Sequence, residues 1–137
     1  MKLEIFTDGG CLGNPGEAAI GVVIKNGART VKTLAKTIGQ GTNNIAEYTA
    51  LIYALQEALI LKADEVSVKS DSELMCKQVS GEYKVKHENI KPLFAHVKHL
   101  VSGFKSFQIA HVPREQNTEA DALVRQVLKK SRSGWPL

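Results

Sequence analysis

Residues 3–24 run LEIFTDGGCLGNPGEAAIGVVI, and three parts of this stretch decide the fold. Residues 3–7 alternate apolar and polar side chains, which predicts a strand with one buried face, and Asp8 ends it. Residues 9–16 contain four glycines and a proline, which predicts a loop. Residues 18–24 are small, apolar and β-branched, which indicates a strand buried on both faces. The chain therefore opens as a β-meander.

The segments that follow extend the meander and then introduce helices. Asn26-Gly27 is a strong hairpin signal, so residues 29–38 are expected to form the return strand. Apolar side chains recur at helical spacing from about residue 44 to residue 61 and predict a long helix. Further strands are expected at 65–70 and 107–112, and further helices at 72–79, from Pro92 and from Asn117.

This order of elements predicts an α/β fold. An opening meander followed by helices that alternate with strands gives a five-stranded mixed sheet with helices on both faces. A length of 137 residues corresponds to one domain, and residues 1–137 are expected to form it. The sequence contains no internal repeat, linker or low-complexity tract.

Composition narrows the class of protein. Hydrophobic residues at 43% and charged residues at 23% exclude disordered and fibrous classes. No apolar run approaches the ~20 residues of a membrane span, and the first residues lack the apolar region of a signal peptide. Two cysteines are too few for a disulfide scaffold. We expect a cytoplasmic protein without a membrane partner, whose net charge of +4 slightly favours an anionic partner.

Four acidic residues occupy positions at which their side chains can converge. Asp8 and Asp71 follow the ends of predicted strands, at the sheet edge where α/β proteins form their sites. Glu47 and Asp121 lie in the first turns of predicted helices. Three or four carboxylates from separate elements can hold magnesium for phosphodiester chemistry.

Each acid also has a purely structural interpretation. Residues 44–47, 70–73 and 118–121 each resemble a capping box, in which the last side chain binds a backbone N–H at the start of a helix. Acidic side chains in a first turn are favoured by the helix dipole, and Asp8 before two glycines can start a turn. Taken singly, these patterns favour capping, and only their combination indicates a site.

Four segments of the chain carry a joint pattern: TDGGCLGNPG at 7–16, TNNIAE at 42–47, SDS at 70–72 and HVPREQNTEADAL at 111–123. Together they resemble the type 1 ribonuclease H family, most closely its compact bacterial and archaeal form. The order and spacing of the segments agree over roughly residues 1–128. The resemblance implies a ribonuclease H-like fold and cleavage of the RNA strand of RNA–DNA hybrids, with 5′-phosphate and 3′-hydroxyl ends.

The resemblance also implies the catalytic and metal-binding residues. Asp8 would bridge two Mg²⁺ ions, for which Mn²⁺ can substitute, with Asp71 on one ion and Glu47 and Asp121 serving the other. One ion would activate a water and the other would stabilise the leaving 3′ oxygen. His111 stands at the offset of the family's assisting histidine and would move a proton or help the product leave. Alternatively, it packs at the end of a strand or lies on the surface.

Substrate contacts follow from the same resemblance. Larger relatives grip the hybrid with an inserted basic handle, which is missing here, where only a short segment at 81–89 is present. The basic side chains of that segment either bind phosphates or form a solvated loop, and a second basic group, Lys129, Lys130 and Arg132, lies near the C-terminus. Gly9, Cys11 and Asn14 are expected to contact the RNA backbone, Asn43 and Asn44 the minor groove, and Thr42 a DNA phosphate. Further substrate contacts are expected from Lys84, Lys86 and Asn117.

The leading hypothesis from the sequence is a stand-alone, monomeric, magnesium-dependent ribonuclease H that acts on RNA–DNA hybrids. One alternative is a catalytically weak nucleic-acid-binding module with the same fold. Another is a nuclease that acts mainly on duplex RNA. The presence of all four acids favours an enzyme over a binding module.

Overall fold

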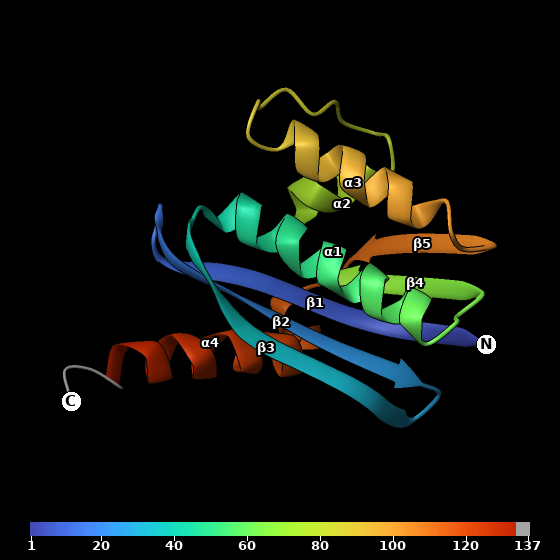
Figure 1. Ribbon diagram of the computed structural model, residues 1–137, viewed down its shortest axis with the longest axis horizontal. Coiled ribbons are helices and arrows are strands. Elements are labelled where there is room, and N and C mark those ends of the chain that lie inside the picture. Colours follow the sequence, from blue (N-terminus) through green and yellow to red (C-terminus); the bar gives the residue numbers. More distant parts are fainter. Residues whose placement is uncertain (134–137) are drawn as a thin grey trace.

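The computed structural model describes residues 1–133 and confirms the expected five-stranded mixed sheet with helices on both faces (Figure 1). The order of strands and helices along the chain is also the predicted one, with one short 3₁₀ helix added before the last helix. The elements are β1 (Lys2–Gly13), β2 (Gly16–Asn26), β3 (Arg29–Gly41), α1 (Asn43–Ile60), β4 (Glu65–Ser70), α2 (Glu73–Val79), α3 (Lys91–Val101), β5 (Ser106–His111), η1 (Arg114–Gln116) and α4 (Thr118–Ser133).

The sheet has the strand order β3-β2-β1-β4-β5, so β1 lies at its centre. The first three strands are antiparallel neighbours, whereas β4 runs parallel to β1 and β5 runs parallel to β4. Thr7 on β1 is in register with Ser70 on β4, and Ser70 is in register with His111 on β5. The carboxyl ends of β4 and β5 therefore lie level with Thr7, in the middle of β1.

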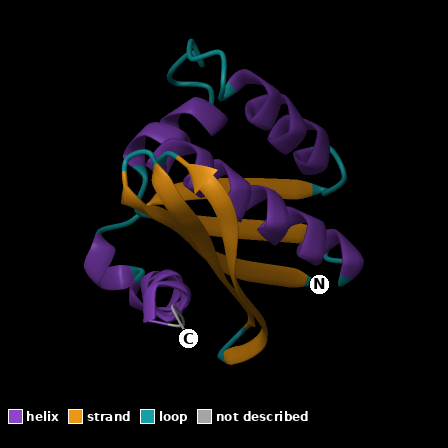
Figure 2. Cartoon of the chain, turned by 60° about the vertical axis from the view of Figure 1, so that its left-hand side comes forward, coloured by secondary structure: helices purple, strands orange, loops and turns teal. Residues whose placement is uncertain are grey.

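Helices cover the two faces of the sheet unequally. The helices α1, α2 and α3 lie on one face, and α4 lies alone on the other (Figures 1 and 2). The main core lies under α1, where Leu51 and Leu55 are fully buried against strand residues such as Ile5. A smaller cluster around Val124 and Leu128 fixes α4 to the opposite face. In the described part of the chain, no helix is long and apolar enough to cross a membrane.

The prediction of a loop over residues 9–16 is wrong. Strand β1 continues to Gly13, which pairs with Gly16 on β2, so that Asn14 and Pro15 alone form the turn. Gly9 serves close packing instead, because a Cβ there would lie 2.3 Å from the carbonyl carbon of Ala46 on α1. Composition cannot distinguish a flexible loop from a strand that another backbone approaches closely.

The hairpin between β2 and β3 is confirmed with a shift of one residue. Asn26 pairs with Arg29, so Gly27 and Ala28 form the turn rather than Asn26 and Gly27. Gly27 adopts a φ of +64°, which a residue without a Cβ adopts readily. The segment between α2 and α3 is a short loop, as expected for a chain without the basic handle.

Gly9→Ala is expected to destabilise the protein by about 1–3 kcal/mol or more, because the added Cβ would overlap the backbone of α1 at 2.3 Å. Gly10→Ala is the matched control, since its Cβ would meet only the Val124 side chain at 3.6 Å. Urea unfolding of both variants measures the difference. Equal stability would show that α1 does not approach β1 as closely as the structure indicates.

Candidate metal-binding active site

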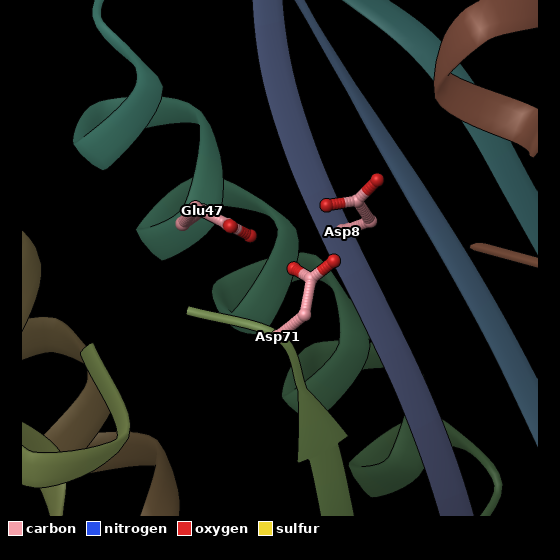
Figure 3. Close-up of side chains that lie close together, drawn as sticks. All are labelled: Asp8, Glu47 and Asp71. Atoms are coloured by element: carbon pink, nitrogen blue, oxygen red, sulfur yellow. The ribbon is translucent and has the colours of Figure 1, made fainter. Parts of the chain in front are cut away.

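Three acidic side chains converge where β4 ends beside the middle of β1. Asp8 lies within β1, Asp71 directly follows β4, and Glu47 is the fifth residue of α1, one turn later than the sequence predicts (Figure 3). Carboxylate oxygens of these three residues all lie within 4.8 Å of one another. Asp8 and Glu47 are 7% and 8% exposed. The structure therefore gathers three of the four predicted acids into one largely buried cluster.

Strand register and one close backbone contact explain this convergence. Thr7 and Ser70 are in register on parallel strands, so the residues that follow them, Asp8 and Asp71, emerge side by side. Glu47 joins them because α1 packs directly on Gly9, whose backbone N–H donates to Glu47 Oε1 at 3.0 Å. This hydrogen bond fixes the Glu47 carboxylate toward the other two acids.

The capping interpretation of Glu47 and Asp71 is wrong. Helix α1 is capped by Thr42, whose hydroxyl accepts from the backbone N–H of Ile45 at 3.2 Å. Helix α2 is capped by Ser72 rather than by Ser70. Asn44 therefore lies inside α1 and does not cap it, and the two acids are left to form the cluster.

Asp121 stands beside this cluster rather than within it. It lies in the first turn of α4, on the other face of the sheet, and its carboxylate is 3.1 Å from Arg125 Nη2. Its charge and its side-chain hydrogen bond both act on Asp8. Asp121 thus contacts the cluster through Asp8.

The environment of the cluster favours protonated acids when no cation is present. Burial, followed by the charges of Asp71 and Asp121, raises the pKa of Asp8 to about 8. Burial and the charges of Asp8 and Asp71 raise the pKa of Glu47 well above its usual value, although the Gly9 N–H acts in the opposite direction. A divalent cation would replace this repulsion with attraction. The all-oxygen donor set fits a hard ion such as Mg²⁺ or Mn²⁺.

Asn117 has a position that its sequence motif does not predict. It is 1% exposed, and its Nδ2 donates to the backbone carbonyl of Thr7 at 2.8 Å. The backbone N–H of Asp121 donates to the carbonyl of Asn117 at 3.1 Å. Asn117 therefore ties the start of α4 to the strand residue before Asp8, and in this structure it does not face a substrate. From the sequence, a buried Asn117 could not be distinguished from an Asn117 that contacts substrate, because both can occur within a polar motif.

The structure places the other predicted site residues in different parts of the molecule. His111 is exposed at the end of β5, in register with Ser70, so it does not pack inside the sheet. Asn14 and Thr42 line a hollow of about 390 Å³ together with Asn43 and Asn44. Cys11 lies next to that hollow, where its thiol donates to Asn43 Oδ1 at 3.2 Å.

The basic residues of the loop between α2 and α3 are exposed. Lys84 and Lys86 line a second hollow of about 420 Å³ beside Leu74 and Tyr83. Sequence analysis did not select these two neighbours, of which Leu74 is 42% and Tyr83 49% exposed. The sequence signal for this surface is the aromatic Tyr83 close to two lysines, a combination that is typical of single-stranded nucleic-acid binding. Lys129 is exposed, whereas the side chains of Lys130 and Arg132 lie outside the part that the structure describes.

Comparison with known proteins identifies the family. Residues 6–127 match the reverse transcriptase-like family. The solved structure of RNase H1 from Halobacterium salinarum is similar to this chain with a TM-score of 0.92 and 37% identity, over 95% of this chain and 99% of the other. The chain belongs to the ribonuclease H family. LC11-RNase H1, solved in complex with an RNA/DNA hybrid, is similar at 42% identity and a TM-score of 0.88, over 94% and 98% of the two chains.

Curated relatives of this chain include longer proteins. A bifunctional protein of Mycobacterium tuberculosis is 39% identical over 130 residues, which cover 93% of this chain and 36% of the relative. The ribonuclease HI of Halobacterium salinarum is 38% identical over 93% of this chain and 64% of its own length. The chain therefore spans about a third of the first relative and less than two thirds of the second.

The metal-free protein is expected to lose stability as the pH rises. The folded state holds a proton on Asp8 up to a pKa of about 8, whereas the unfolded chain releases it near the ordinary value of 3.8. This contribution to stability is therefore present at low pH and is lost as the pH rises from about 4 to 8. Thermal melts in EDTA across this range measure it.

Asp8→Asn is the control for that measurement, because an amide does not titrate. Its Tm should vary less with pH than that of the wild type and should be the higher of the two near pH 8. Magnesium should raise the wild-type Tm more at pH 8 than at pH 5, since the cation competes with bound protons. Parallel Tm curves for the two proteins would contradict the raised pKa of Asp8.

Asn117→Ala is expected to lower the free energy of unfolding by about 1–3 kcal/mol, because it leaves the buried Thr7 carbonyl without its donor. Gln116→Ala, at the preceding exposed position, should change it by less than about 0.5 kcal/mol. Urea denaturation compares the two. A neutral Asn117→Ala substitution would mean that the hydrogen bond to Thr7 does not hold α4 in place.

Proposed function

We propose that this chain is a ribonuclease H that hydrolyses the RNA strand of RNA–DNA hybrids and leaves 5′-phosphate and 3′-hydroxyl ends. The observation that carries this proposal is the convergence of Asp8, Glu47 and Asp71 within 4.8 Å of one another where β4 ends beside β1. Such a cluster suits divalent-cation chemistry on phosphodiesters. Its relative LC11-RNase H1, solved with an RNA/DNA hybrid, supports the substrate class.

The proposal includes two Mg²⁺ ions as cofactors, with Asp8 shared between them. Divalent cations supply Lewis-acid stabilisation of the charge that develops on a reacting phosphate and provide a nucleophile at neutral pH. Asp8 and Glu47 must release their protons to act as ligands, so cation binding and proton release are linked. Asp121 is proposed as the fourth ligand, because its side chain already reaches Asp8.

The surrounding residues of this chain would hold the acids in place. The Gly9 N–H orients the Glu47 carboxylate, and Asn117 holds the start of α4 against β1. Arg114 Nε lies 3.7 Å from Asp71 Oδ2, and this exposed guanidinium could also meet a phosphate. The acids therefore need little rearrangement to bind cations.

The proposed substrate surface extends from the acids to both hollows. In the first hollow, Asn43 and Asn44 would meet the minor groove and Thr42 a DNA phosphate. Asn14 in this hollow, together with Gly9 and Cys11 outside it, would lie against the RNA backbone. In the second hollow, Lys84 and Lys86 would contact phosphates beside Tyr83. A monomeric state, a cytoplasmic location and activity on duplex RNA stay predictions from the sequence.

A cleavage assay with Asp8→Asn tests the proposed function. Labelled RNA–DNA hybrid, duplex RNA and duplex DNA are each incubated with Mg²⁺, Mn²⁺ or EDTA. The wild type is expected to cut the RNA strand of the hybrid with Mg²⁺ and to be inactive in EDTA. Asp8→Asn should lose about 10³-fold or more in rate, which corresponds to several kcal/mol of lost charge stabilisation, without a loss of Tm.

The same gel separates the alternative functions. Binding of the hybrid without cleavage would indicate a nucleic-acid-binding module. Preferential cleavage of duplex RNA would indicate a nuclease that acts mainly on duplex RNA. Cleavage by Asp8→Asn at a rate near that of the wild type would overturn the proposed role of the acidic cluster.

His111 is proposed to assist by proton transfer or product release. Its side chain is exposed, so His111→Ala should leave the Tm unchanged. Single-turnover cleavage should slow by about tenfold or more, since acid–base assistance is typically worth about 10²-fold or more. His96→Ala, at an exposed position on α3, is the matched control and should cleave normally. An unchanged rate for His111→Ala would leave that residue with no part in catalysis.

A further inference from the structure

Strand β5 forms one edge of the sheet and lacks the features that usually protect an edge. It pairs with β4 on one side, and among the described residues no strand pairs with it on the other (Figure 1). Its segment SFQIA at 106–110 contains no charged side chain and no proline, and its pairing with β4 runs without a register shift. Charged side chains, prolines and bulges are the usual means by which an edge strand avoids pairing with another chain. The β5 edge is therefore open to a further strand.

The opposite edge of the sheet, formed by β3, carries these protective features. Arg29, Lys32 and Lys36 lie along it and are exposed, and its pairing with β2 shifts register at two places. Both edges belong to one sheet, so the contrast between them does not come from the sheet as a whole. Strand addition is opposed at β3 and is not opposed at β5.

A third hollow, of about 730 Å³, lies beside β5. One wall is the strand itself, and the other walls come from the end of α2, from α3 and from the turn between α3 and β5. Its larger apolar side chains all belong to the main core or pack against it, and they are Val79, Val101, Phe104, Phe107 and Ile109. Alternate side chains of a strand point to the same face of a sheet. An added strand could therefore place every second side chain against this apolar lining.

The rim of this hollow is basic. Lys98 on α3 and Lys105 before β5 line it and are exposed. In the part of the chain that the structure describes, neither lysine forms a salt bridge. Asp64, whose backbone carbonyl accepts from the Lys105 N–H at 2.8 Å, holds its carboxylate 2.6 Å from the N-terminal amine of Met1. The two lysines are therefore available to acidic groups of a partner.

The surrounding sequence has the same sign of charge. Residues 89–114 contain no acidic residue, and their lysine and arginine residues are Lys91, Lys98, Lys105 and Arg114. This segment supplies α3, β5 and the turn between them, so most of the walls of the hollow come from a stretch without negative charge. The complement to this surface is an acidic partner.

An acidic peptide fits this surface better than a nucleic acid or a second copy of the chain does. A second copy would bring two basic surfaces together, and like charges oppose each other across an interface. A nucleic acid would meet the lysines with its phosphates, but Phe104 and Phe107 pack against the core and do not stand free to stack on bases. An extended acidic peptide with alternate apolar residues pairs with the strand edge, the apolar lining and the lysines together.

We propose that the β5 edge and the hollow between β5 and α3 form a docking site for an extended acidic segment of a partner protein, which adds to the sheet as a further strand. Its backbone would pair with β5, its alternate apolar side chains would enter the hollow, and its acidic side chains would meet Lys98 and Lys105. The hollow shares no residue with the acidic cluster or with the two hollows of the proposed substrate surface. The docking site therefore does not depend on the proposed function.

Selection from a displayed library of random peptides tests the site. The peptides have about twelve residues, which is long enough to span a strand. Peptides that also bind the Lys98→Glu/Lys105→Glu variant are removed first, and the rest are selected on the wild-type protein. The enriched peptides should be acidic, with apolar residues at alternate positions. Failure to enrich such peptides would overturn the docking site.

Fluorescence anisotropy with a labelled enriched peptide measures the contribution of the two lysines. The Lys98→Glu/Lys105→Glu variant should bind about tenfold more weakly than the wild type, because two exposed ion pairs become repulsions. Arg29→Glu/Lys32→Glu makes the same change in charge on the β3 edge and should bind within about twofold of the wild type. All three proteins should have the same Tm, since all four side chains are exposed. Equal weakening by the two variants would reduce the effect to net charge and contradict the site.

Backbone N-methylation distinguishes strand addition from other modes of docking. In a strand, the N–H groups of alternate residues point to the same side. Two forms of the enriched peptide are made, one methylated at odd and one at even amides. Strand addition predicts that one form loses binding by about tenfold or more and that the other binds as the unmethylated peptide does. Equal losses for the two forms would show that the peptide does not pair with β5.

Two further measurements detect the other occupants. Sedimentation velocity of the wild type should show no self-association that the Lys98→Glu/Lys105→Glu variant abolishes. Binding and cleavage of the RNA–DNA hybrid should be the same for this variant and for Arg29→Glu/Lys32→Glu. Self-association would assign the surface to a second copy, and a selective loss of hybrid binding would assign it to nucleic acid. Either result would overturn the peptide site.

Discussion

The contact between the Gly9 backbone and the start of α1 is the constraint on which the site depends. No side chain larger than hydrogen fits there, because a Cβ on Gly9 would lie 2.3 Å from the Ala46 carbonyl carbon. The close approach lets the Gly9 N–H reach Glu47 at 3.0 Å. It also brings a helix on one face of the sheet against the central strand next to Asp8. The position of Glu47 relative to Asp8 is thus fixed by backbone packing.

The acidic cluster is held together against its own electrostatic repulsion. Burial and neighbouring charges raise the pKa of Asp8 and of Glu47, which shows that the folded protein disfavours their charged forms. The fold therefore holds acidic side chains whose mutual repulsion is relieved when a divalent cation binds. On the other face, the buried hydrogen bond from Asn117 to Thr7 holds α4, and with it Asp121, beside Asp8. The free energy gained from packing therefore keeps the mutually repelling acidic side chains close together.

The sequence by itself determined the order of elements, because hydrophobic periodicity changes from two to 3.6 residues at each boundary between strand and helix. It also indicated that four acids from separate elements can converge. It could not determine that residues 9–13 continue β1 past Asp8, since glycine composition is the same for a loop and for a closely packed strand. Nor could it decide between capping and metal binding for Glu47, because that depends on which residue caps α1, and the cap is Thr42.

Only the tertiary structure decided which polar residues meet. The parallel register of β1 and β4 placed Asp71 beside Asp8, and that register depends on pairing between strands more than fifty residues apart. Asn117 belongs to a polar motif by sequence, yet the packing of α4 buries it at 1% exposure. Local patterns specify elements, whereas contacts between distant elements depend on packing that no local pattern contains.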